Sequence, residues 1–224
     1  MEHAVEISVQ NVRLVGDLVV PPHASGVVLF AHGSGSSRTI PRNRAVATAL
    51  QARGFATLLL DLLTENEEWL DERTAQLRFD IDLLAGRLVG AIDWLGRYPE
   101  TERLPIGLFG ASTGGGAALV AAAQRPGTVV AVVSRGGRPD LAGIALPRVA
   151  APTLLIVGSL DREVIRMNRD AMAQMRGEVR LDLVPGATHL FEERGALEEV
   201  ARLASDWFAQ WLPARAAISP KAAK

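Results

Sequence analysis

Leu104-Pro-Ile-Gly-Leu-Phe-Gly-Ala-Ser-Thr-Gly114 is an apolar run that ends in a G-x-S-x-G pattern, and an Ala/Gly-rich segment of helical composition comes directly after it. A strand, a sharp turn and a helix in this order form a nucleophile elbow, which presents a serine at the top of a sheet. Glycines two residues before and after Ser112 let the strand and the helix approach closely. A pattern this short also occurs by chance in a Gly-rich turn, so the assignment depends on residues further along the chain.

The acid and base that such a serine needs come later in the chain. A serine hydroxyl is a poor nucleophile at neutral pH unless a histidine accepts its proton and a carboxylate orients that histidine. In chains with a catalytic elbow of this kind, the acid follows the serine and the histidine follows the acid. Thr153-Leu-Leu-Ile-Val157 predicts a buried strand, and Asp161 comes shortly after its end. Arg180-Leu-Asp-Leu-Val184 predicts another strand, and His189 lies in the loop beyond it.

Other carboxylates compete for the role of acid. Asp140 follows the predicted strand 129–134 and is an alternative, because a triad is defined by geometry and not by sequence position. Asp161 is preferred, since Gly158 frees its turn and Asp161 follows its strand more closely. Asp61 also follows a strand candidate, and we interpret it as a carboxylate that fixes a loop or helix.

An earlier strand, Val27-Val-Leu-Phe-Ala31, leads into His32-Gly-Ser-Gly-Ser-Ser37. An oxyanion hole combines the N–H after the nucleophile with one from the loop after such a strand. This loop meets that need, with His32 as part of its scaffold. Nucleotide binding is a minor alternative, because the loop completes neither G-x-G-x-x-G nor G-x-x-x-x-G-K-[ST].

Together these motifs resemble those of the α/β-hydrolase superfamily, and most closely its small dienelactone-hydrolase-like serine hydrolases. The resemblance spans about residues 5–212, and the chain is also similar to modules that occur fused to phosphoribosyltransferase domains. It rests on HGSGSSR at 32–38, GASTGGG at 110–116, GSLD at 158–161 and GATHLF at 186–191.

The resemblance implies roles for individual residues. Ser112 would be the nucleophile, Asp161 the acid and His189 the base, with the amides of Ser34 and Thr113 as oxyanion donors. Dienelactone hydrolase itself has a cysteine at the elbow, whereas this chain contains none. The substrate of that enzyme therefore cannot simply be carried over.

The remaining pattern predicts an α/β fold, a mostly parallel doubly wound sheet of about eight strands. Residues 5–9 and 12–20 alternate in polarity, as an antiparallel pair at the N-terminal edge would. Strand candidates at 27–31, 56–60, 104–109, 129–134, 153–157 and 180–184 are apolar on both faces, as parallel strands between helical layers are. Apolar residues at helical spacing predict core-facing helices around 81–95 and 197–211.

Composition agrees with one globular domain. With 224 residues, 48% hydrophobic and 22% charged, we expect a single domain over residues 1–212 and a flexible tail at 213–224. A net charge of −1 favours neither nucleic acid nor an anionic membrane as a partner. Without cysteine, and without ligands at suitable spacing around its histidines, the chain is predicted to use no metal and no cofactor. The start lacks a signal-peptide pattern and no apolar run is long enough to span a membrane, so a cytoplasmic location is expected.

Several arginines gather at the predicted active edge of the sheet. Arg38, Arg42 and Arg44 follow the oxyanion loop, and Arg135 and Arg138 follow another strand. Arg38 and Arg42 are candidates for binding a carboxylate or phosphate on the substrate. The alternative is that these arginines pair with the acidic run Glu65-Asn-Glu-Glu68 on a neighbouring loop.

The sequence thus predicts a serine hydrolase that cleaves a small ester or related acyl compound through an acyl-Ser112 intermediate. The same triad would serve an acyltransferase or thioesterase, and a non-catalytic binding module is the alternative from another class. A homodimer is left open. No cap domain is expected, since 135–152 has room for one short helix and the acidic segment 61–75 makes a poor apolar lid. We therefore expect a shallow site that prefers short acyl groups.

Overall fold

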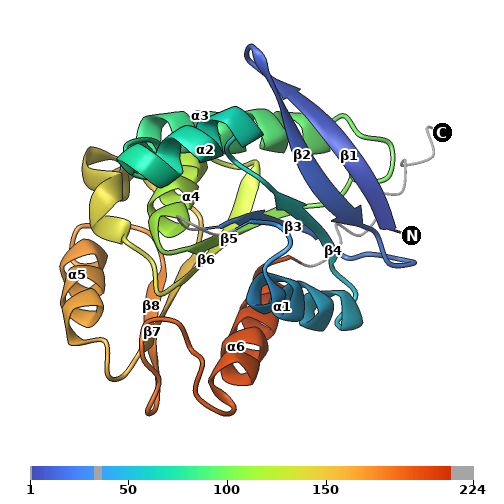
Figure 1. The fold of residues 1–224 in the computed structure, drawn as a ribbon. Coiled ribbons are helices and arrows are strands. Elements are labelled where there is room, and N and C mark those ends of the chain that lie inside the picture. The colour runs from blue at the N-terminus through green and yellow to red at the C-terminus, as the bar shows by residue number, and fades with distance from the viewer. Residues whose placement is uncertain (1, 33–36, 213–224) are drawn as a thin grey trace.

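The computed structural model describes residues 2–32 and 37–212, and its ribbon is drawn in Figure 1. One sheet of eight strands runs through it in the order β1-β2-β4-β3-β5-β6-β7-β8. β3 to β8 are parallel, whereas β1 and β2 form an antiparallel hairpin at one edge, as the sequence predicts. The strands are β1 (Glu2–Val9), β2 (Val12–Val19), β3 (Val27–Ala31), β4 (Ala56–Leu60), β5 (Ile106–Ala111), β6 (Val129–Arg135), β7 (Thr153–Gly158) and β8 (Val179–Val184).

Helices cover both faces of the sheet, which is the doubly wound α/β-hydrolase arrangement (Figure 1). α3, α4 and α5 pack on one face, and α1 and α6 pack against each other on the opposite face. The helices are α1 (Pro41–Ala52), α2 (Glu65–Thr74), α3 (Ile81–Leu95), α4 (Thr113–Gln124), α5 (Arg162–Met172) and α6 (Ala196–Trp211), with 3₁₀ segments η1 (Leu77–Phe79) and η2 (Pro139–Arg148).

The predicted apolar stripe on α3 faces the core. Asp80 caps the helix by accepting a hydrogen bond of 2.9 Å from the N–H of Leu83. Apolar residues then recur every three or four positions, so they share one face of the helix. All five members of the stripe are buried: Ile81, Leu84, Leu88, Ile92 and Leu95.

The central strands are buried on both sides, so their ends are fixed firmly in space. β3, β4, β5 and β7 contain only buried residues, and the sheet separates two large apolar clusters. β8 differs from the expectation of a strand apolar on both faces, because it is the last strand of the sheet and most of its residues are partly or fully exposed.

The connections beyond the strand ends are short. Between β6 and β7 the chain forms only η2, which kinks at Gly143, and between β4 and α3 it forms α2 and η1. Among residues 2–32 and 37–212 no cap domain is therefore inserted. Within the same residues, no helix has the length and apolar character needed to cross a membrane.

Candidate active site

Ser112 occupies a strained turn between β5 and α4. Its φ of 50° lies in the left-handed region, which is costly for a residue with a side chain. A Cβ at Gly110 would come within 2.6 Å of the Gly114 carbonyl oxygen, and one at Gly114 within 2.1 Å of that of Ala31. Only glycine fits at both positions, and Ser112 itself is partly exposed. The predicted elbow is therefore present in the fold.

Backbone hydrogen bonds fasten this turn to the end of β6. The Ser112 N–H donates to the carbonyl oxygen of Arg135 at 3.3 Å. The Ser112 carbonyl oxygen accepts from the N–H groups of Arg138 and Gly115, each at 3.0 Å. The strained conformation is thus held from both sides of the turn.

Asp161 and His189 meet at the same edge of the sheet. Asp161 follows β7 and His189 follows β8, and His189 Nδ1 lies 2.7 Å from Asp161 Oδ2. An ionised carboxylate only accepts hydrogen bonds, so Nδ1 carries the proton and Nε2 is left with a lone pair. The Asp161 side chain is 15% exposed and that of His189 is 41% exposed. The histidine is therefore oriented by a mostly buried acid while remaining accessible.

The loops that carry the acid and the base are joined to each other. The Leu160 N–H donates to the Ala187 carbonyl oxygen at 3.0 Å, and a Cβ at Gly158 would come within 2.4 Å of that oxygen. Thr188 donates from its N–H to Glu193 Oε1 at 3.0 Å. These contacts fix the positions on either side of the acid–base pair, so its geometry does not depend on one hydrogen bond.

The rival acid Asp140 has another partner. Arg138 donates to both of its carboxylate oxygens, from Nε at 2.9 Å and from Nη2 at 2.7 Å. A bidentate pair of this kind satisfies the carboxylate without a histidine. The structure therefore brings Asp161, and not Asp140, to His189.

One of the two predicted oxyanion donors can be placed. Thr113 is the first residue of α4, so its N–H has no acceptor within the helix, and the helix N-terminus favours negative charge there. Ser34 lies outside the described residues.

Asp61 fixes the chain on both sides of the segment that contains Ser34, as its interpretation as a loop-fixing carboxylate predicts. It accepts the Arg38 backbone N–H at 2.7 Å and also the Arg38 guanidinium, and His32 Nε2 lies 3.4 Å away. Burial alone would raise the pKa of Asp61, but hydrogen bonds from His32 and Arg38 outweigh it and lower the pKa.

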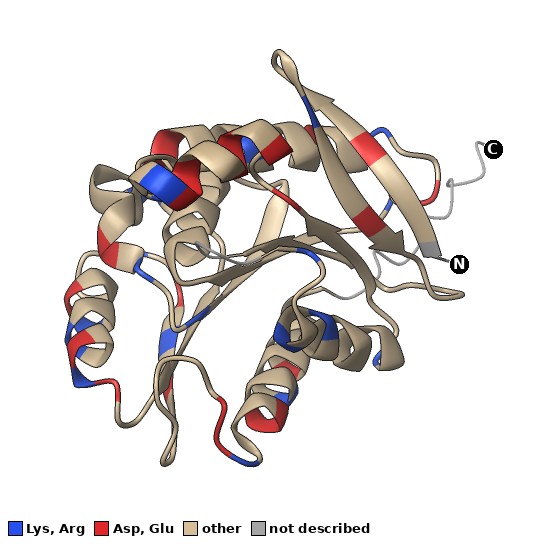
Figure 2. Ribbon diagram, viewed as in Figure 1, with Lys and Arg blue, Asp and Glu red and all other residues tan. Residues whose placement is uncertain are grey.

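The carboxylate partners of Arg38 and Arg42 lie outside the acidic run 65–68. Arg38 lies between Asp61 and Asp17, with its Nε 3.5 Å from Asp17 Oδ1, which favours a structural role. Arg42 Nη1 lies 3.6 Å from Glu192 Oε1, so its carboxylate partner is not in the run 65–68. Acidic residues predominate on α2, whereas both signs of charge occur on α3 and α5 (Figure 2).

Arg135 is buried, and the sequence does not reveal its environment. Arg135 is only 7% exposed, and the described residues give its side chain no hydrogen bond or ion pair. Its guanidinium carbon lies 5.7 Å from the centre of the Phe191 ring. Burial, together with the nearby charge of Arg42, lowers the pKa of Arg135 to about 10. An arginine at the end of a mostly apolar strand is the sequence signal for this position.

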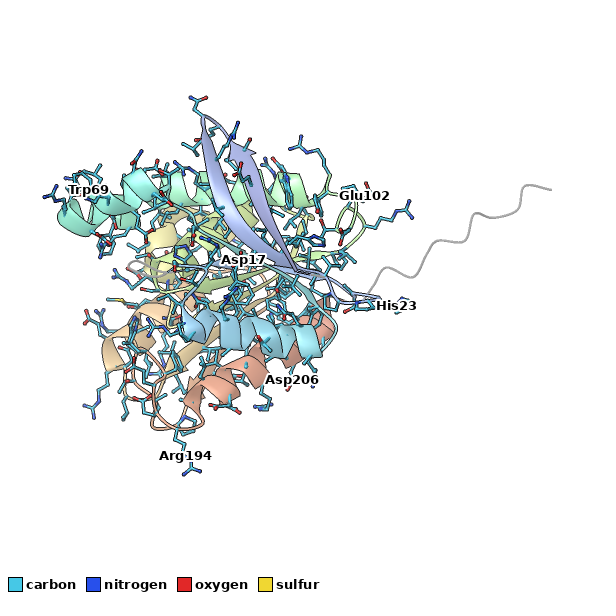
Figure 3. The ribbon with its side chains drawn as sticks, turned by 45° about the vertical axis from the view of Figure 1, so that its right-hand side comes forward. Asp17, His23, Trp69, Glu102, Arg194 and Asp206 are labelled. Carbon is cyan, nitrogen blue, oxygen red and sulfur yellow. The ribbon has the colours of Figure 1, made fainter. Side chains whose placement is uncertain are left out.

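Apolar residues of the segments that follow β4 and β8 divide into two groups. Leu62 and Phe191 are buried and belong to the core. Trp69 is 60% exposed and projects from α2 at the periphery of the molecule, as Figure 3 shows, with the Arg73 guanidinium 4.4 Å from its ring. Leu190, beside the candidate base, is 41% exposed and is therefore available to a substrate.

Comparison with known proteins identifies similar sequences and structures. The model of the dienelactone hydrolase family matches residues 15–213. A crystal structure of dienelactone hydrolase from Anabaena variabilis is 65% identical, with a TM-score of 0.93 over 95% of this chain and 98% of that one. Est1E from Butyrivibrio proteoclasticus shares the fold, with a TM-score of 0.77 at 16% identity over 92% of this chain and 98% of that one.

A curated relative is longer than this chain. A putative phosphoribosyl transferase of Mycobacterium tuberculosis is 56% identical over 207 residues, which cover 92% of this chain and 46% of that protein. The chain thus spans less than half the length of the curated relatives it matches.

Proposed function

Because the chain belongs to the dienelactone hydrolase family, we propose that it is a serine hydrolase that cleaves a small ester through an acyl-enzyme on Ser112. The family and its α/β-hydrolase relatives support a hydrolase. The serine mechanism rests mainly on one observation, the 2.7 Å contact between Asp161 and His189 at the edge of the sheet that also presents Ser112.

The proposed reaction has two stages, acylation of Ser112 and hydrolysis of the acyl-enzyme. His189 Nε2 takes the proton of the Ser112 hydroxyl as its oxygen attacks the ester carbonyl. The amides of Thr113 and Ser34 stabilise the negative oxygen of the tetrahedral intermediate. His189 then gives its proton to the departing alkoxide, and water, activated in the same way, releases the acid from Ser112. Asp161 remains ionised and stabilises the charged histidine throughout.

Substrate size follows from how open the site is. Ser112 is partly exposed, and the segments 61–75 and 135–152 form α2 and η2 and no further domain. We therefore expect short acyl groups to be cleaved best, without activation at lipid–water interfaces. A rate maximum at long p-nitrophenyl esters would contradict this.

Covalent labelling with a fluorophosphonate tests the mechanism. The wild-type protein should react at Ser112, and Ser112→Ala should lose both labelling and ester hydrolysis, because only a serine with a positioned proton acceptor attacks this reagent. Ser8→Ala, an exposed serine on β1, is the control and should behave as wild type. Labelling that persists in Ser112→Ala would overturn the assignment.

A matched pair of aspartates tests the acid. Asp161→Asn should lower kcat by about 10⁴-fold, because the histidine would be held in the wrong tautomer. Asp140→Asn should have little effect, since Asp140 is paired with Arg138. Labelling with no turnover of esters would instead favour an acyltransferase or thioesterase, and no labelling at all would favour a binding module.

A further inference from the structure

β8 ends the sheet on the side away from the β1–β2 hairpin, and no described strand pairs with its outer edge (Figure 1). Such an edge presents free N–H and C=O groups to any strand that can pair with it, and proline, lysine or a bulge commonly prevents this. β8 contains no proline and no lysine. Its register with β7 is unbroken from Thr153–Val179 to Gly158–Val184. The outer edge of β8 is therefore open to another strand.

The backbone groups that β8 turns outward can be assigned. The Val184 carbonyl oxygen accepts the N–H of Ser159, which follows β7, at 2.9 Å. Backbone groups alternate in direction along a strand, so the even-numbered positions of β8 turn theirs toward β7. The positions between them turn theirs to the open edge: Val179, Leu181 and Leu183.

The two faces of β8 differ in chemistry. Leu181 packs against the apolar cluster between β7 and α5, and Leu183, on the same face of the strand, is 39% exposed. On the opposite face, Arg180 donates to both carboxylate oxygens of Asp182, from Nε at 2.8 Å and from Nη2 at 2.5 Å. The Arg180 side chain is 58% exposed. The open edge thus has an apolar face and a face that carries both signs of charge.

A second copy of β8 fits this edge when it runs antiparallel and a two-fold axis passes through Leu181. The outward groups of Leu181 then pair with those of the same residue in the second copy, and those of Val179 pair with those of Leu183. Arg180 lies opposite Asp182 of the second copy, at a position where cross-strand side chains are closest. By symmetry each of these contacts is made twice, and unlike charges meet in both.

Other two-fold registers use the edge less well. The axis must pass through a residue whose backbone groups face outward, which leaves Val179 and Leu183 as alternatives. Both lie near an end of β8, which spans only Val179–Val184, so an axis at either would leave most of the strand unpaired. The other edge strand, β1, has no large apolar residue among its exposed side chains. Length, exposed apolar surface and charge therefore favour β8, with its axis at Leu181.

We propose that β8 is a homodimer interface, at which two copies of this chain pair their β8 strands antiparallel and join their sheets into one. The proposal does not depend on the hydrolase function. Since the paired strands run in opposite directions, the two sheet edges that carry Ser112 lie at opposite ends of the joined sheet. Each copy therefore keeps its own candidate active site.

Charge variants of the full chain test the interface by sedimentation velocity. The wild-type protein should have twice the mass of one chain. Asp182→Arg and Arg180→Asp each place like charges opposite one another, and each should raise the dissociation constant of the dimer by at least about 10-fold. An equimolar mixture of the two variants should form a heterodimer, because every arginine at these positions then faces an aspartate. Glu6→Arg, which changes an exposed charge on β1, is the control and should remain dimeric.

A wild-type protein that is monomeric at the highest concentration at which it stays soluble would overturn the proposal. A dimer that neither variant weakens would place the interface on another surface. Failure of the mixed variants to associate, with both folded by circular dichroism, would reject the register.

Cysteine cross-linking tests the register without changing any charge, and it also serves if a charge variant does not fold. The chain contains no cysteine, so a single introduced thiol can be followed. Leu181→Cys should form a disulfide-linked dimer with oxidised glutathione, because paired Cα atoms about 5.5 Å apart lie within the range of a disulfide. Leu183→Cys is the control, since this more exposed position faces Val179 of the second copy and should not cross-link. Equal cross-linking of the two variants would contradict an axis at Leu181.

Discussion

Two arginines are buried among the residues that the structure describes, and their surroundings differ in one respect. Arg87, on α3, is 3% exposed and donates to Glu67 Oε1 at 2.7 Å, to Glu67 Oε2 at 3.1 Å and to the Leu62 carbonyl oxygen at 3.2 Å. Arg135, on β6, is 7% exposed and has no such anion among the described residues. Both leave Nε without a partner, so the contrast lies in the terminal nitrogens and the carboxylate.

The contrast separates an arginine that holds the fold from one that is available for function. Glu67 accepts from Arg87 and also completes a capping box with Thr64 at the start of α2, so the pair fastens that helix against α3. Arg135 forms no ion pair with the described residues, and its carbonyl oxygen accepts the Ser112 N–H. A buried cation without a partner costs stability, which natural proteins tolerate mainly at functional sites.

The largest effect on the free energy of unfolding is expected when the carboxylate partner of Arg87, Glu67, is removed. Glu67→Ala should lower the free energy of unfolding by about 2–4 kcal/mol, because it leaves a buried guanidinium uncompensated and removes the capping box. Urea unfolding at neutral pH measures this. Glu65→Ala, an exposed glutamate in the same helical turn, is the control and should cost less than about 1 kcal/mol. A similar loss in both variants would remove the distinction between the two arginines.

Replacing each arginine by methionine should change stability in opposite directions. Arg135→Met removes an unpaired buried charge and keeps an apolar side chain of similar length, so the free energy of unfolding should rise by about 1–2 kcal/mol without added anion. Arg87→Met should lower it, since Glu67 loses its partner. Thermal unfolding in a buffer free of phosphate and carboxylate measures both. A fall for Arg135→Met would assign its guanidinium a structural role.

Phe191 is the group that partly compensates Arg135, and a double-mutant cycle measures by how much. We expect a coupling of about 1 kcal/mol between Arg135→Met and Phe191→Leu, the range found for partly desolvated cation–π contacts. The cycle uses the same unfolding measurement. A coupling as large as that between Glu67 and Arg87 would mean that the aromatic ring replaces the carboxylate fully, and the argument for a missing anion would fail.

The sequence predicts the part of the site that follows from strand ends. In a parallel sheet the carboxyl ends of neighbouring strands meet at one edge, so Ser112, Asp161 and His189 could be assigned to that edge from their positions after apolar runs. The family resemblance and the α/β-hydrolase fold are both confirmed. The apolar stripe on α3 could also be predicted from the sequence, because its period of three to four residues is a local property.

The sequence does not determine which charged groups meet. The sequence favours Asp161 over Asp140 without excluding Asp140, and the structure shows Asp140 paired with Arg138 and Asp161 in contact with His189. The surroundings of Arg135 include the Phe191 ring and the charge of Arg42, which come from segments far apart in sequence. Side-chain contacts between distant segments leave no periodic or motif signal. The sequence therefore did not show that Arg38 pairs with Asp61, or that Arg42 lies near Glu192 and not near the run 65–68.

The smallest effect is expected from a change in pH, and it comes from the protonation of Glu67. Burial would raise the pKa of Glu67, but hydrogen bonds from Arg87 and Thr64 outweigh it and hold the pKa below the ordinary 4.5. A carboxylate whose pKa is lower in the folded state stabilises the fold above its unfolded pKa and loses that contribution as the pH falls.

The wild-type protein should therefore lose stability relative to Glu67→Gln as the pH drops below 4.5, and the difference between them should be constant from pH 6 to 8. Urea midpoints from pH 8 to 3 measure it, with Glu65→Gln as the control. A stability difference that stays unchanged down to pH 3 would show that Arg87 does not stabilise the ionised form of Glu67. Glu67 would then support the fold through its shape and its capping hydrogen bonds, and its charge would not explain the contrast between Arg87 and Arg135.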